Sequence, residues 1–277
     1  MTIHPAARPV HLTAVHVYPV KGLGGISLEK SAVTRRGLQF DRRFLVIDNN
    51  DTFVTQREIP KMATVWMEIE DGKVVFAAPD MEPLVLPAEP PELPSHLVRI
   101  WRSHVLAHHV SAEANAWLSE YLGFDARLVY MPDSSERKIN PEFAKNNEIV
   151  SFADGYPLLV ISEASLADLN ARMVANGGAA LAMNRFRPNL VISGCEAYAE
   201  DRFGEIRVGD AIFRGVKHCA RCQVTTTDQA SGEVRGPEPL QTLGTYRNTP
   251  DGTMFGMNLV PVKLATVRVG DEVTWAA

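Results

Sequence analysis

The chain has 277 residues, of which 45% are hydrophobic and 22% are charged, a composition typical of globular proteins. Its net charge is −5 and it has no long basic run, which argues against nucleic acid as a main partner. Three cysteines are too few for a disulfide framework, and no apolar run approaches the roughly 20 residues of a membrane span. We therefore expect a cytoplasmic protein that does not enter a membrane.

The first predicted element is a strand from Leu12 to Tyr18. Pro19 and Gly22 break the extended pattern that precedes them. Lys21 is therefore expected at the end of a strand, in a turn whose backbone can come close to a ligand.

The next hundred residues predict hairpins and one helix. Pairs of short extended runs joined by turns predict hairpins at 44–56, 64–77 and 98–110. Six prolines between residues 79 and 94 leave room for at most a short edge strand. A helix is predicted over 113–122, with Ser111 as its N-cap and Gly123 as its end.

The second half begins with a polar segment, 131–147, that is either a loop over a site or a plain solvated connection. A buried strand over 157–161 leads into Ser162, which can cap a helix that runs to Ala175. Short strands then return, with a Gly-Asp turn at 209–210 that recurs near the end of the chain. Many short strands and only two clear helices favour a β-barrel over a doubly wound sheet.

A pair of cysteines, Cys219 and Cys222, lies among basic residues that include Arg221. Neighbouring cations stabilise a thiolate, so one of these sulfurs could be a nucleophile or a metal ligand. The β-branched residues that follow predict that the pair lies at the start of a strand. Two alternatives are that both cysteines are buried packing residues, or that they bind zinc, which is disfavoured because Cys195 is the one cysteine left to complete a site.

Several cationic residues lie at strand ends or beside residues that break regular structure. They are Lys21, Arg42, Arg187 and Arg221. If they converge they form a pocket for an anionic group, although each alone is more often a surface charge. No phosphate-binding loop or dinucleotide fingerprint is present. Asp154 and Asp228 are candidate proton carriers, or residues that cap turns.

Taken together, five stretches of this sequence resemble the MOSC-domain proteins, and in particular the branch that contains the mitochondrial amidoxime-reducing component and its bacterial relatives. The matching stretches are 17–22, 41–42, 159–166, 186–194 and 219–228. The resemblance spans nearly the whole chain. It implies a mainly β protein with an N-terminal MOSC β-barrel domain over 10–125 and a MOSC domain over 126–277.

The resemblance also implies a molybdenum cofactor of the molybdopterin type, with Cys222 as the thiolate ligand of the metal and Cys219 as a non-ligand neighbour. The residues that it places against the pterin or its phosphate are Lys21, Arg42, Arg187, Asn189 and Arg221. Relatives have a Thr-Ser pair and a tyrosine where this chain has Gly155, Tyr156 and Asn258. These three positions are expected at the cofactor, with altered hydrogen bonds.

The implied reaction is the two-electron reduction of N-hydroxylated compounds, whose oxygen leaves as water, with Asp154 on the proton route. No cysteine follows Cys222, so this sequence holds no iron–sulfur domain of the kind found in some relatives. We therefore expect a separate electron donor, a flavin reductase with or without an iron–sulfur or haem carrier. The alternatives are a sulfur-transfer or cofactor-carrier protein, with Cys222 as a persulfide or docking thiol, and a β-barrel binding module whose cysteines only pack.

Overall fold

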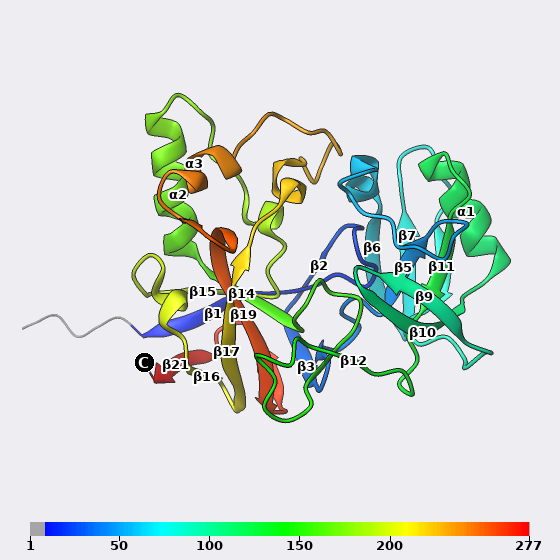
Figure 1. The fold of residues 1–277 in the computed structure, drawn as a ribbon, viewed down its shortest axis with the longest axis horizontal. Coiled ribbons are helices and arrows are strands. Elements are labelled where there is room, and N and C mark those ends of the chain that lie inside the picture. Colours follow the sequence, from blue (N-terminus) through cyan, green and yellow to red (C-terminus); the bar gives the residue numbers. More distant parts are fainter. Residues whose placement is uncertain (1–8, 277) are drawn as a thin grey trace, which may run out of the picture.

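The computed structural model describes residues 9–276. Its regular structure is mostly β-strand, which confirms the predicted fold class (Figure 1). The α-helices of the described part are α1 (Ala112–Leu122), α2 (Glu163–Ala175) and α3 (Leu240–Gly244). None of these helices is both long and apolar enough to cross a membrane.

Seven strands close into a barrel, in the left half of Figure 1. Around the barrel they follow the order β14, β15, β1, β21, β16, β17 and β19, and β19 pairs with β14. Their bounds are β1 (Val10–Val17), β14 (Leu158–Ser162), β15 (Leu190–Ser193), β16 (Glu205–Val208), β17 (Ala211–Ala220), β19 (Gly252–Lys263) and β21 (Glu272–Ala276). Only β14 and β15 pair in parallel, because the chain returns through α2 between them.

The barrel has an apolar interior and short strands at its margins. Leu12 and Val15 of β1, Phe213 of β17 and Leu259 of β19 are fully buried there. Full burial of such a side chain stabilises the fold by about 1.5–3 kcal/mol. The marginal strands are β2 (Ile26–Leu28), β3 (Lys30–Thr34), β4 (Gly37–Leu38), β18 (Asn248–Thr249) and β20 (Thr266–Arg268).

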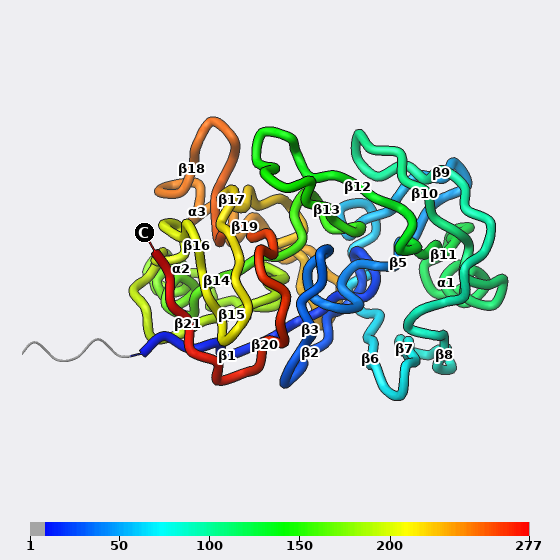
Figure 2. The backbone as a smooth tube through the Cα atoms, turned by 90° about the horizontal axis from the view of Figure 1, so that it is seen from below, coloured from blue at the N-terminus to red at the C-terminus, as the bar shows by residue number. Residues whose placement is uncertain are grey.

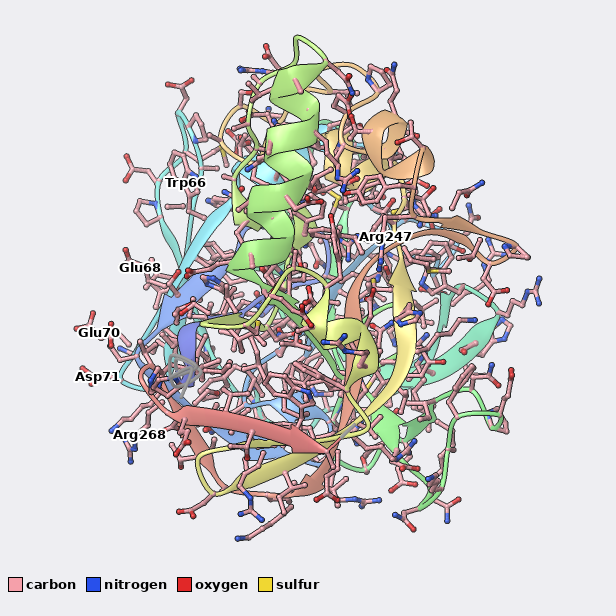
Figure 3. The ribbon with its side chains drawn as sticks, turned by 90° about the vertical axis from the view of Figure 1, so that its left-hand side faces the viewer. Trp66, Glu68, Glu70, Asp71, Arg247 and Arg268 are labelled. Carbon is pink, nitrogen blue, oxygen red and sulfur yellow. The ribbon has the colours of Figure 1, made fainter. Side chains whose placement is uncertain are left out.

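The other half of the molecule, which we call the N-terminal lobe, consists of two small sheets and α1 (Figure 1). One sheet has the order β5 (Phe44–Ile47), β11 (Arg127–Tyr130), β10 (Ser103–His109) and β9 (His96–Ile100). The other has β6 (Trp66–Glu70), β7 (Lys73–Ala77) and β8 (Leu84–Pro87). On β6, Met67 is buried while Trp66, Glu68 and Glu70 point outward (Figure 3), the alternation expected of a half-buried strand.

The structural halves do not follow chain order, because β1 and β3 pair with the C-terminal strands β21 and β20. The chain thus enters the barrel first, crosses to the N-terminal lobe, and returns. The predicted division after residue 125 stays a prediction about the domains.

The predicted helix over 113–122 is confirmed. The Ala114 amide donates to the Ser111 hydroxyl at 3.0 Å, and Gly123 ends the helix with a φ of 80°. The proline-rich stretch contains the short strand β8, as expected. The hairpin predicted at 44–56 is partly wrong, since β5 pairs with β11 and the second arm makes only one bridge to β5, from Phe53 to Ile47, and another to β9, from Thr52 to Arg99.

The prediction that the cysteine pair begins a strand is wrong. Cys219 lies near the end of β17, and the residues after Cys222 form the 3-10 helix η4 (Gln223–Thr226). The hydroxyl group of Thr225 donates to the Cys222 carbonyl at 2.9 Å, and that of Thr226 to the Gln223 carbonyl at 2.8 Å. These local bonds satisfy the backbone in a tight turn and override the β preference of threonine.

The polar segment 131–147 is more than a solvated loop. It forms β12 (Arg137–Lys138), which pairs with β13 (Ile149–Val150), and it buries the Arg137 side chain. In Figure 2 these two strands lie between the barrel and the N-terminal lobe. The remaining 3-10 helices are η1 (Pro60–Thr64), η2 (Met183–Phe186) and η3 (Ala199–Arg202).

Candidate functional site

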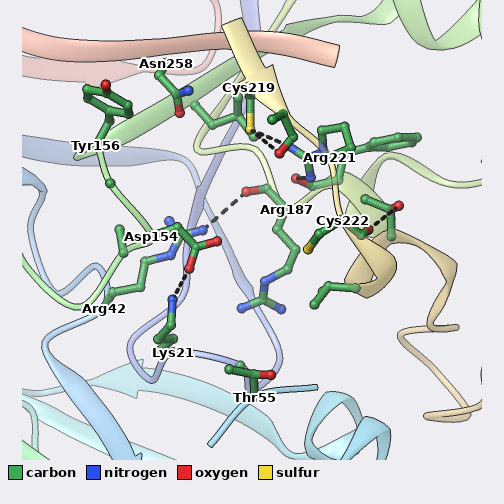
Figure 4. A pocket seen from close by; sticks show the side chains of 18 of the residues that line it. Lys21, Arg42, Thr55, Asp154, Tyr156, Arg187, Cys219, Arg221, Cys222 and Asn258 are labelled. Carbon is green, nitrogen blue, oxygen red and sulfur yellow. Dashed lines mark hydrogen bonds and ion pairs between the residues drawn. The ribbon is translucent and has the colours of Figure 1, made fainter. Parts of the chain in front are cut away.

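One pocket is lined by side chains from both halves of the molecule, and we call it the interlobe pocket (Figure 4). The ten residues to which the family resemblance assigns a place at the site line it: Lys21, Arg42, Asp154, Gly155, Tyr156, Arg187, Asn189, Arg221, Cys222 and Asn258. These positions are up to 237 residues apart in the chain, from 21 to 258. The fold therefore brings these ten positions to one place, and their roles stay predictions. Asp228, the other candidate proton carrier, does not line it, and its carboxylate instead accepts from the backbone amides of Ala230 and Ser231 in its own turn.

The two cysteines of the pocket differ in their surroundings. The Arg221 guanidinium donates to the Cys219 sulfur at 3.0 Å and to the Phe186 carbonyl. Cys222 is the residue before η4, and the part of the chain that the structure describes offers its sulfur no hydrogen-bond donor or acceptor. Cys219 is thus engaged by the protein, while the Cys222 thiol is left available within the pocket.

Arg42 and Arg187 form a fixed pair at the barrel side of the pocket. Both residues have a left-handed backbone, with φ of 49° and 54°. Their side chains therefore reach the pocket from turns and not from strands. Arg42 donates to Asp41 at 2.6 Å, to the Asn189 side-chain oxygen at 3.1 Å and to the Arg187 carbonyl at 3.4 Å. Asn189 donates in turn to the His16 carbonyl, which ties the pair to β1.

Burial and neighbouring charges set the protonation of Arg42 and Arg187. Burial raises the pKa of Asp41, and the Arg42 charge only partly offsets this shift. The ion pair with Asp41 outweighs burial and raises the pKa of Arg42. Burial, helped by the Arg42 charge and opposed by Tyr18, lowers the pKa of Arg187 to about 10. Arg187 is still protonated at neutral pH, so two buried guanidinium charges face the pocket.

Lys21 and Asp154, which both line the pocket, form an ion pair. The Lys21 side chain is only 10% exposed, and burial lowers its pKa while Asp154 opposes that shift. Asp154 is 67% exposed, yet it also accepts from the Trp101 indole at 3.2 Å. Its crowded surroundings penalise the charged form, but the Lys21 charge and hydrogen bond outweigh this and hold the pKa of Asp154 well below its usual range.

The loop that carries Asp154 is held from behind by Arg137. The buried Arg137 guanidinium donates to the carbonyl groups of Ser151, Ala153 and Asp154, at 3.0, 2.5 and 2.8 Å. Burial lowers the pKa of Arg137 to about 10, so the group remains charged. A buried cation that meets three carbonyl groups fixes the backbone on which Asp154 is placed.

The three positions that depart from the family pattern have distinct surroundings. A Cβ added at Gly155 would meet no atom within 4 Å, so that side of the pocket is open. The Tyr156 ring packs edge-on against Phe143 at 6.0 Å, and burial raises the pKa of Tyr156 to about 12. The Asn258 amide donates to the Lys217 carbonyl at 3.0 Å, across the β17–β19 ladder.

The N-terminal lobe contributes lining residues that were not expected from the sequence. They are Thr55, Gln56, Arg57 and Trp101. Trp101 lies in the turn between β9 and β10 with a φ of 54°, and Arg57 stacks on its ring at 4.6 Å. The one available signal was a tryptophan in a two-residue hairpin turn, where glycine or asparagine is usual.

The sequence matches two family models, the MOSC N-terminal beta barrel domain over residues 10–125 and the MOSC domain over residues 147–274. Among curated proteins, mitochondrial amidoxime reducing component 2 of Rattus norvegicus is 34% identical over 95% of this chain and 82% of its own length. The Homo sapiens protein of that name is 34% identical over 93% of this chain and 81% of its own length. The molybdenum cofactor sulfurase of Oryza sativa subsp. japonica is 31% identical over 92% of this chain and 33% of its own length.

Among solved structures, the YUAD protein from Bacillus subtilis is 9% identical over 95% of this chain and 94% of that chain, with a TM-score of 0.41. The family relationship follows from the sequence matches alone. This chain belongs to the MOSC-domain proteins that also carry the N-terminal MOSC β-barrel domain, a group that includes the mitochondrial amidoxime-reducing components.

Proposed function

We propose that this protein is a molybdenum-cofactor-dependent reductase of N-hydroxylated compounds such as amidoximes and hydroxylamines. One observation carries the proposal: the Cys222 thiol shares a pocket with five cationic side chains from separate segments of the chain, Lys21, Arg42, Arg57, Arg187 and Arg221. The named relatives add to it, because an amidoxime reducing component and a molybdenum cofactor sulfurase both match nearly this whole chain. Association with the molybdenum cofactor is what these two functions have in common.

The residues of the pocket suit such a cofactor. A soft thiolate is an appropriate ligand for a metal that already has sulfur ligands, and arginine binds phosphate through two parallel hydrogen bonds. The Arg221 Nε atom is buried and has no hydrogen-bond partner among the described residues, so a donor is left for a ligand. Gly22 also lines the pocket, and its φ of 86° is a backbone conformation that other residues rarely adopt, so the turn beside Lys21 requires glycine.

When bound, the cofactor supplies the two-electron chemistry that removes the N-hydroxyl oxygen as water. In this proposal Cys222 holds the metal, and the pterin and its phosphate are held by Lys21, Arg42, Arg187, Asn189 and Arg221, with Gly155, Tyr156 and Asn258 alongside. The walls of the pocket orient the substrate and limit access of water.

Asp154 has a conditional role in the proposal. While its carboxylate is paired with Lys21 it stays ionised at neutral pH and has no proton to donate. An anion that draws Lys21 away would let the pKa of Asp154 rise toward its ordinary value, so that its carboxylate could take up and pass on a proton.

The proposal includes a small N-hydroxylated substrate and a separate electron donor. The donor we propose is a flavin reductase, with or without an iron–sulfur or haem carrier. Purified protein that reduces an amidoxime directly from NADH, with no other protein added, would contradict this part of the proposal.

A second candidate function is sulfur transfer, because the rice sulfurase matches 92% of this chain. In that case Cys222 would carry a persulfide instead of binding metal. Its thiol is free to do so, since it makes no hydrogen bond within the described residues.

The experiment that separates the two uses purified full-length protein and an artificial reductant. The reductase proposal predicts conversion of benzamidoxime to benzamidine and loss of this activity in Cys222→Ser. Cys219→Ser is the matched control and should remain active. Absence of reduction, together with a persulfide on Cys222 found by mass spectrometry, would favour sulfur transfer.

A further inference from the structure

The ring of one tyrosine contacts both of the paired arginines of the pocket. The guanidinium carbons of Arg42 and Arg187 lie 4.3 and 4.2 Å from the centre of the Tyr18 ring. Tyr18 is 4% exposed and is not among the residues that line the pocket. Both cations that face the pocket from this side therefore rest on one buried aromatic ring.

The ring is held firmly by its own contacts. The Tyr18 hydroxyl donates to the Pro188 carbonyl at 3.0 Å, and the Tyr18 amide donates to Asp41 at 2.8 Å. The ring also packs against Gly25, where an added Cβ would come within 2.4 Å of it. Tyr18 is thus attached to the two segments that carry the arginines, at Asp41 beside Arg42 and at Pro188 beside Arg187.

The Tyr18 ring can offset two costs of placing Arg42 and Arg187 together. Two guanidinium groups brought close together repel each other, and burial adds a desolvation cost to each. Asp41 compensates Arg42 directly through an ion pair of 2.6 Å. Arg187 has no carboxylate within ion-pair distance among the described residues, and its side chain makes one hydrogen bond, to Gln229 at 3.3 Å. The negative face of an aromatic ring attracts a cation, and planar guanidinium groups stack on it well.

We propose that Tyr18 is a positioning residue for an anion site in the interlobe pocket, and that its ring sets the spacing and orientation of Arg42 and Arg187 so that both can hold one phosphate group. This inference rests on the proposed function in taking that phosphate to be part of the pterin cofactor. Binding of an anion at Arg42 and Arg187 requires only side chains of this protein, so it can be measured without metal and without catalytic turnover.

The test measures binding of inorganic pyrophosphate to the metal-free full-length protein by titration calorimetry. Tyr18→Phe keeps the ring and should bind within about twofold of the unchanged protein, whereas Tyr18→Leu should bind about tenfold more weakly. Tyr246→Leu is the matched control, because the Tyr246 ring stacks on Arg172 at 4.2 Å outside the pocket. It should leave pyrophosphate affinity unchanged.

Two further variants keep the test decisive if Tyr18→Leu does not fold. Pentafluorophenylalanine at position 18 preserves the shape of phenylalanine but reverses the polarity of the ring face, so it should also weaken binding about tenfold relative to Tyr18→Phe. In an Arg42→Ala, Arg187→Ala background the same replacement should have no further effect, because Tyr18 acts through these arginines.

Equal affinity in Tyr18→Phe and in the pentafluoro variant would overturn the inference. So would an equal loss from the ring replacement with and without the arginines. Failure of the proposed function is seen separately, as absence of molybdenum or of amidoxime reduction in a protein whose pyrophosphate binding behaves as predicted.

Discussion

The Lys21 ammonium group is paired with the Asp154 carboxylate inside the interlobe pocket, so one of the cations proposed to hold an anion already has a negative partner. An incoming phosphate must compete with Asp154 for this cation. We therefore expect Asp154→Asn to tighten pyrophosphate binding about three- to tenfold at pH 7, since it removes a nearby like charge.

The same variant should make binding more sensitive to pH. Burial already lowers the pKa of Lys21 and Asp154 opposes that shift, so without Asp154 the ammonium group loses its proton at lower pH. Calorimetric titrations between about pH 6 and 9 check both effects. Weaker binding in Asp154→Asn at pH 7 would mean that Asp154 orients Lys21 instead of competing for it.

The open space beside Gly155 predicts that a family-like serine is tolerated there. An added Cβ meets nothing within 4 Å, and the backbone at Gly155 does not have positive φ. Gly155→Ser should change the free energy of unfolding by less than about 0.5 kcal/mol. Gly256→Ala is the contrasting control, since its φ is 84° and its Cβ would lie 2.7 Å from Ile161, and it should destabilise by about 2 kcal/mol or more. Denaturant unfolding measures both, and a large loss in Gly155→Ser would show that the loop needs glycine.

Arg137 should control the order of the loop that carries Asp154. Its guanidinium group meets the carbonyls of Ser151, Ala153 and Asp154, and Arg137→Met leaves these groups without their charged donor. We expect a loss of about 2–4 kcal/mol in stability and faster amide hydrogen exchange across residues 151–155. Lys138→Met, next to it on β12 but exposed, is the control. Unchanged exchange in 151–155 would contradict the positioning role of Arg137.

Glu148 gives a prediction for stability against pH. Burial opposes its charge, but backbone amides of Lys145 and Asn146 and the Arg214 side chain outweigh this and lower the pKa of Glu148 to about 2. Because the folded pKa lies below the unfolded one, the stabilisation is present above about pH 4.5 and is lost as the pH falls toward 2. Glu148→Gln should therefore cost on the order of 3 kcal/mol at neutral pH, and less in acid.

Thermal unfolding of Glu148→Gln and of the unchanged protein, from pH 7 down to the acid limit of folding, checks this sign. The exposed Glu142→Gln is the control. A difference between the two proteins that grows with acidification would contradict the assignment.

The sequence predicted which residues meet in the pocket better than it predicted the local structure around them. Lys21 and Arg187 were recognised as cations beside strand ends, and Cys222 as one of a cysteine pair with basic neighbours. Spacing alone could not show that they converge, and it was the resemblance to a family that assigned them to one site. The capped helix α1 was also readable, since its capping bonds are local.

What the sequence could not supply depends on contacts between distant segments. Trp101 reaches Asp154 only because two parts of the molecule meet at the pocket. The buried Arg137 side chain donates to a carbonyl group of another segment, that of Ser151. The residues after Cys222 looked like a strand because threonine favours strands, yet their hydroxyl groups bond to their own turn. Tyr18 was visible as part of a motif, but its contact with two arginines was not.

In the proposed function, the Cys222 thiol binds molybdenum in the interlobe pocket. Metal analysis of the purified full-length protein, with Cys222→Ser and Cys219→Ser prepared in parallel, tests it most directly. We predict about one molybdenum atom per chain in the unchanged protein and in Cys219→Ser, and almost none in Cys222→Ser. Molybdenum retained in Cys222→Ser, or absent from all three, would contradict the account.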